Sequence, residues 1–198
     1  GDWSSDVCSS DLKEVSLAFS YGKMSERLSS NSGTLMVTDP AGPPKFSIYT
    51  INHDTVHLDA YRVNPDQWSA YNNFLREYRK KNSKAVPPGE KLYSGEVDIK
   101  GAPDELTETA IDLRPVFEEL GGQVILVIRK NEKAELRTAV IAWAQRASIA
   151  IDAFVDAGKL LVWTSALADG ASLEGVEVKV SPHGDRKSTR LNSSHALI

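Results

Sequence analysis

A regular series of short segments with strand character, each bounded by turn-forming residues, limits the fold of this chain more than any other feature. The segments "TLMVTD", "KFSIYTI" and "TVHLDAYRV" are rich in β-branched and aromatic residues, and "PAGPP" and "NHD" separate them. The series continues with "KLYSGEVDI", "LTETAIDL" and "LLVWTSAL". Short strands with turns between them are typical of antiparallel β-sandwiches. We therefore predict a mainly β chain made of tandem β-sandwich domains.

Individual segments carry sharper expectations about burial and conformation. The almost continuous apolar run "QVILVIRK" predicts a central strand that is buried on both faces. The alanine-rich "AVIAWAQRA" has the composition of a helix, but the strands around it favour a strand, and "RPVFEEL" predicts a single helical turn. Trp143 and Trp163 lie in apolar strands, so we expect both side chains to be buried.

One amphipathic helix, at about residues 65–81, interrupts the strands. Asn64 suits the cap position, Pro65 suits the first helical position, and Gln67 can reach back to the cap backbone. One stripe of the helix is aromatic and apolar, so we expect it to pack on a sheet; its members are Trp68, Tyr71, Leu75 and Tyr78. Basic residues at the end of the helix complement its dipole and are expected to stay solvated.

The two ends of the chain correspond to one DNA oligonucleotide translated from opposite strands. The stretches "DWSSDVCSSD" and "DRKSTRLNSSH" can be encoded by the two strands of a common sequencing-library adapter. We therefore expect residues 1–12 and 185–198 to be adapter-derived and not native, and we exclude them from reasoning about the fold. The native stretch between them is then expected to be a fragment of a longer protein.

We expect three parts within the native stretch. Residues 13–33 turn from a short apolar run to the polar "SERLSSNSG", which predicts the end of a preceding domain. Residues 34–148 are expected to form one complete sandwich domain. Residues 149–184 are expected to be the truncated start of the next domain. About three strands are too few for a stable unit, so we expect this last part to be loosely packed.

Charge and cysteine content argue against several classes of function. The formal net charge is −4, from 23 Lys and Arg against 27 Asp and Glu, which provides no basic surface for nucleic acid or for an anionic membrane. The single cysteine, Cys8, lies in the adapter-derived N-terminus, so the native stretch has no disulfide, Cys-based zinc site or thiol nucleophile. We expect no nucleic-acid partner and no direct membrane contact by this chain.

Three groups of residues have a feature of a functional site, and a structural explanation is favoured for each. His53 and His57 have a spacing found in metal sites, but no third ligand is near in sequence, so surface histidines are expected. Gly170 and Gly175 have the glycine spacing of a phosphate-binding loop, but the Lys and the Ser or Thr that such a loop needs are replaced by Val and Glu.

Carboxylates around the segment "LTETAIDL" are the third group, namely Glu105, Glu108 and Asp112. Leu106, Glu108, Ala110 and Asp112 share one face, which predicts the solvated side of an edge or outer strand. A paired acid/base site is disfavoured, because no apolar neighbour would raise the pKa of one carboxyl. We therefore predict no catalytic, cofactor-binding or metal-binding residues and a chain that is not an enzyme.

The order and spacing of several motifs resemble the bacterial alpha-2-macroglobulin family. They are "VTDPAGPPKFSIY" at Val37–Tyr49, "YRV" at Tyr61–Val63, "PDQW" at Pro65–Trp68 and "LADGASLEGVEV" at Leu167–Val178. The resemblance covers about Thr34–Val180. It implies tandem macroglobulin-like domains, which are immunoglobulin-like antiparallel β-sandwiches.

The resemblance also implies what the full-length protein does. In this family, a protease cuts a bait segment, the multidomain shell collapses around it, and a reactive thioester can couple to the attacker. The thioester needs a "C-x-E-Q" motif, which the native stretch lacks, so the resemblance implies a scaffold role only. The implied partners are adjacent macroglobulin domains and, through the full-length protein, proteases. The implied location is the periplasm or cell envelope, with a lipid anchor to the inner membrane suggested for the full-length protein.

Two alternative functions stay open from the residues alone. One is an immunoglobulin-like module of a surface adhesin, which would continue as near-identical repeats. The other is an accessory β-sandwich domain of a carbohydrate-active enzyme, which would present exposed aromatic side chains in a row. The expected burial of Trp143 and Trp163 disfavours sugar stacking.

Overall fold

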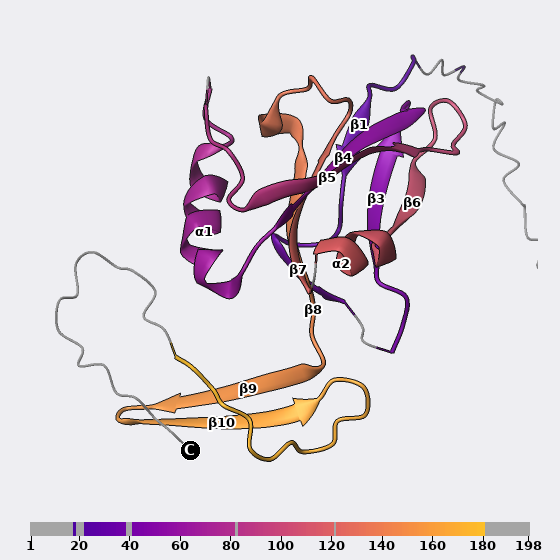
Figure 1. Cartoon of the computed structure of the whole chain (residues 1–198). Helices are drawn as coiled ribbons and strands as arrows, with labels where there is room; N and C mark the ends of the chain where they lie inside the picture. The colour runs from indigo at the N-terminus through magenta and orange to yellow at the C-terminus, as the bar shows by residue number, and fades with distance from the viewer. Residues whose placement is uncertain (1–17, 19–21, 39–40, 82, 121, 181–198) are drawn as a thin grey trace, which may run out of the picture.

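Two β-sheets and a helix form three stacked layers, and a separate β-hairpin follows them, in the computed structural model of the chain (Figure 1). The structure describes residues 18, 22–38, 41–81, 83–120 and 122–180. Both adapter-derived stretches predicted from the sequence lie outside the described residues. The strands are β1 (Arg27–Ser29), β2 (Leu35–Thr38), β3 (Lys45–Ile51), β4 (Thr55–Arg62), β5 (Glu90–Asp98), β6 (Thr107–Asp112), β7 (Gln123–Arg129), β8 (Val140–Arg146), β9 (Ile149–Asp156) and β10 (Lys159–Ala166).

The larger sheet has the order β2-β8-β7-β4-β5, and the smaller sheet has the order β1-β3-β6. All pairs are antiparallel except β2 with β8, which run parallel. The prediction of a mainly β chain with antiparallel sheets and one inserted helix is confirmed. Strand β1 comes from residues 13–33, the part expected to end a preceding domain, and it pairs with β3 in the smaller sheet.

The sheets face each other across an apolar cluster that we call the sheet core. Alternate residues of β4 and β7 point into it, as the period of two in a strand requires. Helix α2 (Arg114–Leu120) also contributes, and it is longer than the single turn predicted for "RPVFEEL". The members of the sheet core are Phe46, Ile48, Val56, Leu58, Ala60, Ile99, Ile111, Leu113, Val116, Phe117, Val124, Leu126, Ile128, Ala142 and Ala144.

The other face of the larger sheet packs against helix α1 (Trp68–Glu77) through a second cluster, the helix core (Figure 1). Trp143 lies at its centre, with its ring edge-on to Trp68 at 5.4 Å and to Tyr71 at 5.4 Å, an arrangement that aromatic rings prefer. The Tyr71 hydroxyl donates to the backbone oxygen of Thr34 over 2.6 Å. The buried members are Val63, Tyr71, Phe74, Tyr78, Ile125, Val127, Ile141 and Trp143.

Strand β7 separates the two cores, so its five apolar residues from Val124 to Ile128 are fully buried. The predictions of a strand buried on both faces and of a strand at "AVIAWAQRA", here β8, are confirmed. The aromatic stripe of α1 packs on the sheet as predicted, and Phe74, which was not predicted to be part of it, packs there too.

The start of the helical segment follows the predicted capping pattern. A 3-10 turn at Pro65–Gln67 precedes α1, and the Gln67 side-chain oxygen accepts from the Asn64 backbone N–H over 2.9 Å. This bond satisfies one of the backbone groups that a helix end leaves open. The α-helix ends at Glu77, before the predicted residue 81. A turn follows it, in which the Lys80 N–H donates to the Glu77 oxygen.

Strands β9 and β10 form a two-stranded hairpin beyond the sandwich (Figure 1). One face carries Phe154, Leu161 and Trp163, which are 62%, 62% and 56% exposed. The prediction that Trp163 is buried is therefore wrong, because no described layer covers this face, whereas Trp143 is buried as predicted. None of the helices in the described ranges is long and apolar enough to cross a lipid bilayer.

Candidate functional site

The structure separates the two histidines that have a metal-site spacing. His53 is partly exposed in the turn between β3 and β4, whereas His57 lies in β4 with only 7% exposure. The prediction of a surface residue is wrong for His57, because its side chain shares the helix-side face of β4 with Asp59 and Tyr61. Within the described ranges, no three His, Cys, Asp or Glu side chains are grouped so that they could hold a metal ion.

The carboxylates of β6 occupy the position predicted for them. Strand β6 is an edge of the smaller sheet, and Glu108 and Asp112 are exposed on it. Asp112 accepts from the Arg114 guanidinium over 2.8 Å, and this hydrogen bond lowers the pKa of the Asp112 carboxyl below its ordinary value. A lowered pKa keeps a carboxyl ionised, which is the opposite of what a general acid needs.

The two glycines considered for phosphate binding lie in the connections after β10. Gly170 and Gly175 have φ angles of 74° and 72°, a backbone region that favours glycine. The Gly170 N–H bonds to the Ala166 oxygen over 2.8 Å, which closes the turn after the strand. Their conformation therefore explains these glycines as turn residues.

A buried polar cluster on the larger sheet was not predicted from the sequence. It centres on Asp59 of β4, which is 1% exposed, and we call it the Asp59 cluster. Strands β4, β5 and β7 bring its members together, since Asp59 lies opposite Ser94 of β5 and His57 lies opposite Arg129 of β7. The members are His57, Asp59, Lys91, Ser94 and Arg129.

Each member of the Asp59 cluster has a polar contact with the carboxylate. Arg129 pairs with Oδ2, while Oδ1 accepts from Ser94 Oγ over 2.8 Å and lies 3.4 Å from Lys91 Nζ. His57 Nε2 lies 3.2 Å from Asp59 Oδ1 and 3.0 Å from Ser94 Oγ. A buried carboxylate with this many partners is stabilised in its ionised form.

The electrostatics of the cluster follow from these contacts. Burial raises the pKa of Asp59. The hydrogen bond from Ser94 and the charges of Arg129 and Lys91 lower it by more than burial raises it, so the pKa lies below its ordinary value. Burial and the Asp59 charge raise the pKa of the neighbouring Tyr61 phenol. Asp59 is therefore ionised near neutral pH and Tyr61 is protonated.

Although Ser, His and Asp meet here, their arrangement is not that of an activated nucleophile. In a catalytic triad, one ring nitrogen takes the serine proton and the other nitrogen bonds to the carboxylate. Here the same nitrogen of His57 contacts both Ser94 and Asp59, and the Ser94 hydroxyl donates a hydrogen bond directly to Asp59. The contacts instead join three strands, so the geometry supports a structural role.

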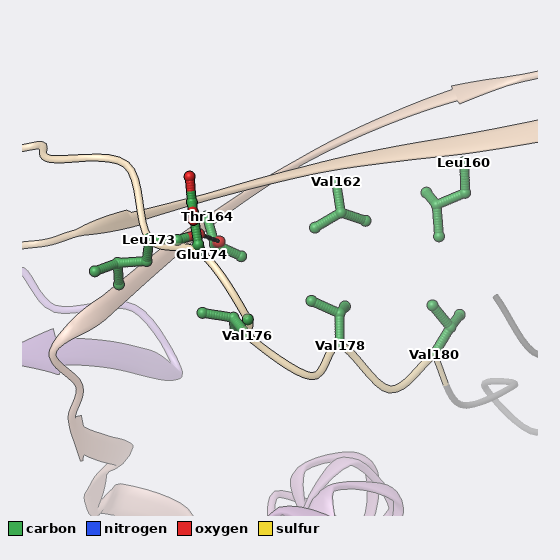
Figure 2. A pocket seen from close by; sticks show the side chains of 9 residues that line it. Leu160, Val162, Thr164, Leu173, Glu174, Val176, Val178 and Val180 are labelled. Atoms are coloured by element: carbon green, nitrogen blue, oxygen red, sulfur yellow. Dashed lines mark hydrogen bonds between the residues drawn. The ribbon is translucent and has the colours of Figure 1, made fainter. Parts of the chain in front are cut away.

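An apolar groove lies between β10 and the segment that follows it. Its volume is about 350 Å³. Figure 2 shows Leu160 and Val162 of β10 facing Val176, Val178 and Val180 across an open gap. The valines alternate with Glu177 and Lys179, which is the pattern of a strand with one apolar face.

Comparison with known proteins relates the chain to others through its fold. No protein-family model matches the sequence, and no curated protein matches it either. The structure is similar to native alpha-2-macroglobulin from Escherichia coli spanning domains MG0-NIE-MG1, with a TM-score of 0.56 and 16% identity. That similarity covers 76% of this chain and 48% of the other, so this chain spans about half of its length.

Two further solved structures give the same result. One is the Escherichia coli protein spanning domains NIE-MG1, with a TM-score of 0.54, 16% identity, and coverage of 75% of this chain and 73% of the other. The other is Salmonella alpha-2-macroglobulin reacted with methylamine, with a TM-score of 0.51, 14% identity, and coverage of 73% of this chain and 8% of the other. The resemblance found in the sequence motifs is thus confirmed at the level of structure: this chain has the macroglobulin-like fold of bacterial alpha-2-macroglobulin domains.

Proposed function

We propose that this chain is a non-catalytic scaffold fragment of a bacterial alpha-2-macroglobulin-like protein, and that the full-length protein traps and inhibits endopeptidases in the cell envelope. The observation that carries the proposal is the similarity to a solved structure spanning two consecutive domains of Escherichia coli alpha-2-macroglobulin, which covers 75% of this chain. The sequence motifs from Val37 to Val178 point to the same family.

The proposed domain organisation fits the change in packing near Ser148. We propose a complete domain at 34–148 and the start of the next at 149–184. In support, both cores end with β8, while the hairpin that begins at Ile149 is exposed along most of β9. The preceding part, 13–33, supplies β1 to the first domain, so this boundary is not a clean break between sheets.

The proposed role is to hold shape and to contact neighbouring macroglobulin domains. A scaffold domain has to keep its shape when the multidomain protein closes. The central strand β7 is packed on both faces, which makes the domain rigid. The apolar groove and the exposed face of the hairpin are the surfaces proposed to meet further protein. A periplasmic or envelope location, with a lipid anchor on the full-length protein, follows from the same proposal.

The proposal is tested by recovering the flanking genomic sequence and expressing the full-length protein. A trap encloses a protease without blocking its active site. The purified protein should therefore inhibit hydrolysis of a large protein substrate by an endopeptidase and leave hydrolysis of a short peptide substrate unchanged. A full-length protein in which the bait segment is deleted is the matched control. Equal inhibition of both substrates, or flanking sequence made of near-identical repeats or a catalytic module, would contradict the proposal.

The exposed aromatic face of the hairpin favours one second candidate, an accessory domain that binds carbohydrate. Trp163 and Phe154 lie on the same exposed face, so the expected burial of Trp163, which disfavoured sugar stacking, is not found. Titration of the chain with soluble oligosaccharides, followed by Trp fluorescence and compared with Trp163→Ala, separates the two functions. A saturable change that Trp163→Ala abolishes would favour the carbohydrate module.

A further inference from the structure

Two turns at one end of the sandwich hold non-glycine residues in the left-handed backbone region. Asn52 lies between β3 and β4 with φ of 56°, and Asp104 lies between β5 and β6 with φ of 62°. Asn and Asp adopt this conformation more readily than other side chains, but it remains uncommon. Two such residues in neighbouring turns indicate that one interaction requires this backbone conformation at both.

The two residues bind each other reciprocally. The Asp104 backbone N–H donates to Asn52 Oδ1 over 2.8 Å, and Asn52 Nδ2 donates to Asp104 Oδ1 over 2.9 Å. Each side chain is therefore fixed by the other turn, although the residues are 52 positions apart in sequence. This pairing aims one donor and one acceptor at the same point.

The main chain of Met24 occupies that point. Its N–H donates to Asp104 Oδ1 over 2.7 Å, and its carbonyl oxygen accepts from Asn52 Nδ2 over 2.7 Å. Both polar groups of one peptide residue are thus bound, as they would be by a neighbouring strand. Met24 is 47% exposed and its side chain takes no part in these bonds, so the recognition depends on the main chain.

We propose that Asn52 and Asp104 form a clasp that binds the main chain of the segment entering β1, and so fixes the direction from which any preceding part of the protein joins the sandwich. Strand β1 has only three residues, which is too few to hold the segment firmly by pairing alone. The clasp adds a second point of attachment three residues before β1. The inference does not depend on the proposed function, because it rests on the sandwich itself.

Contacts along the rest of the segment agree with this role. Lys130 Nζ lies 3.6 Å from the Glu26 carboxylate, and the side chain of Leu28 packs against the sheet core. The Ser30 hydroxyl donates to the Ser47 oxygen over 2.9 Å. The hydrogen bond from Asn52, with the bond from the Met24 N–H, lowers the pKa of Asp104, so its carboxylate is a full acceptor near neutral pH.

Limited trypsin digestion of the full 198-residue chain tests the clasp, because trypsin can cut the Lys23–Met24 bond only when the segment opens. Asp104→Gly and Asn52→Gly each remove the side chain and keep the left-handed backbone accessible. Asp104→Asn is the matched control, because its amide oxygen can still accept both hydrogen bonds. Cleavage is followed by the mass of the fragment that begins at Met24, with cuts after Arg129 and Lys159 as references for the sandwich and the hairpin.

We expect each glycine variant to raise the rate of cleavage after Lys23 about tenfold relative to both reference sites, and Asp104→Asn to raise it less than about threefold. An unchanged rate after Lys23 in both glycine variants would overturn the inference. An equal increase after Arg129 would also overturn it, because the pair would then support the whole sandwich. A full-sized increase in Asp104→Asn would assign the effect to charge and not to main-chain binding, with the same consequence.

Discussion

In the sandwich, β7 is buried on both faces from Val124 to Ile128, whereas in the hairpin Phe154, Leu161 and Trp163 are each more than half exposed. Both regions are built from apolar strands, and in both the side chains alternate between two faces. The difference lies in what covers those faces, since β7 has a sheet on one side and α1 on the other. Alternation therefore identifies which residues share a face, and only the fold decides whether that face is buried.

The largest expected loss of stability comes from replacing Trp143 of the sandwich, with Trp163 of the hairpin for comparison. Trp143→Ala should destabilise the sandwich by about 4 kcal/mol, because it leaves a cavity in the helix core. Trp163→Ala is the matched control and should change the free energy of unfolding by less than about 0.5 kcal/mol. Urea unfolding followed by circular dichroism measures both. Equal losses would show that the hairpin is covered in solution.

The next effect compares a buried ion pair with an exposed one. Asp59→Asn should cost about 3 kcal/mol, because the Arg129 charge would stay buried without its partner. The matched change at the exposed pair, Asp112→Asn, should leave stability nearly unchanged, since solvent screens the charge of Arg114. A small effect of Asp59→Asn in the same urea experiment would mean that water reaches the cluster.

Acid should weaken the sandwich through the same carboxylate. The pKa of Asp59 is lower in the folded chain than its ordinary value of 3.8. Ionised Asp59 therefore stabilises the fold at pH values above about 3.8, and this stabilisation is lost as the pH falls through the folded pKa. The difference in unfolding free energy between the native chain and Asp59→Asn should be constant from about pH 5 to 7 and shrink below about pH 3.8. A difference that stays constant in acid would contradict the lowered pKa.

The smallest effect is expected from removing the hairpin. A chain that ends at Ser148 keeps both cores, so its urea midpoint should stay close to that of the full chain. The exposed hairpin should in turn show fast amide exchange compared with β7, because it buries little apolar surface. A large loss of stability on truncation would show that the sandwich and the hairpin form one cooperative unit.

Sequence patterns predicted the layers well where one local signal sufficed. The capping residues at Asn64 and Gln67 located the helix start, and the apolar run of β7 indicated burial on both faces. The strand at β8 was predicted against its helical composition, because the segments around it have a strand pattern. The exposed carboxylates of the edge strand β6 followed from their spacing.

The errors concern residues whose surroundings come from distant parts of the chain. His57 is buried because Asp59, Ser94 and Arg129 surround it, and only the strand register brings these residues together. One signal was available in the sequence: alternation places Asp59 on the same strand face as Tyr61 and Val63, and an unpaired charge on an apolar face would be costly. Trp163 is exposed because the layer that its face requires is absent from the described residues.

The position of β7 between the sheet core and the helix core has a consequence for how the sandwich unfolds. Loss of the α1 layer would wet Ile125 and Val127, and loss of the smaller sheet would wet Val124, Leu126 and Ile128. Loss of either layer therefore exposes one face of β7 to solvent. Neither the sheet core nor the helix core can unfold while β7 stays fully buried. The amides of β7 should be the last to exchange with deuterium, and they should exchange at one common rate set by whole-domain unfolding.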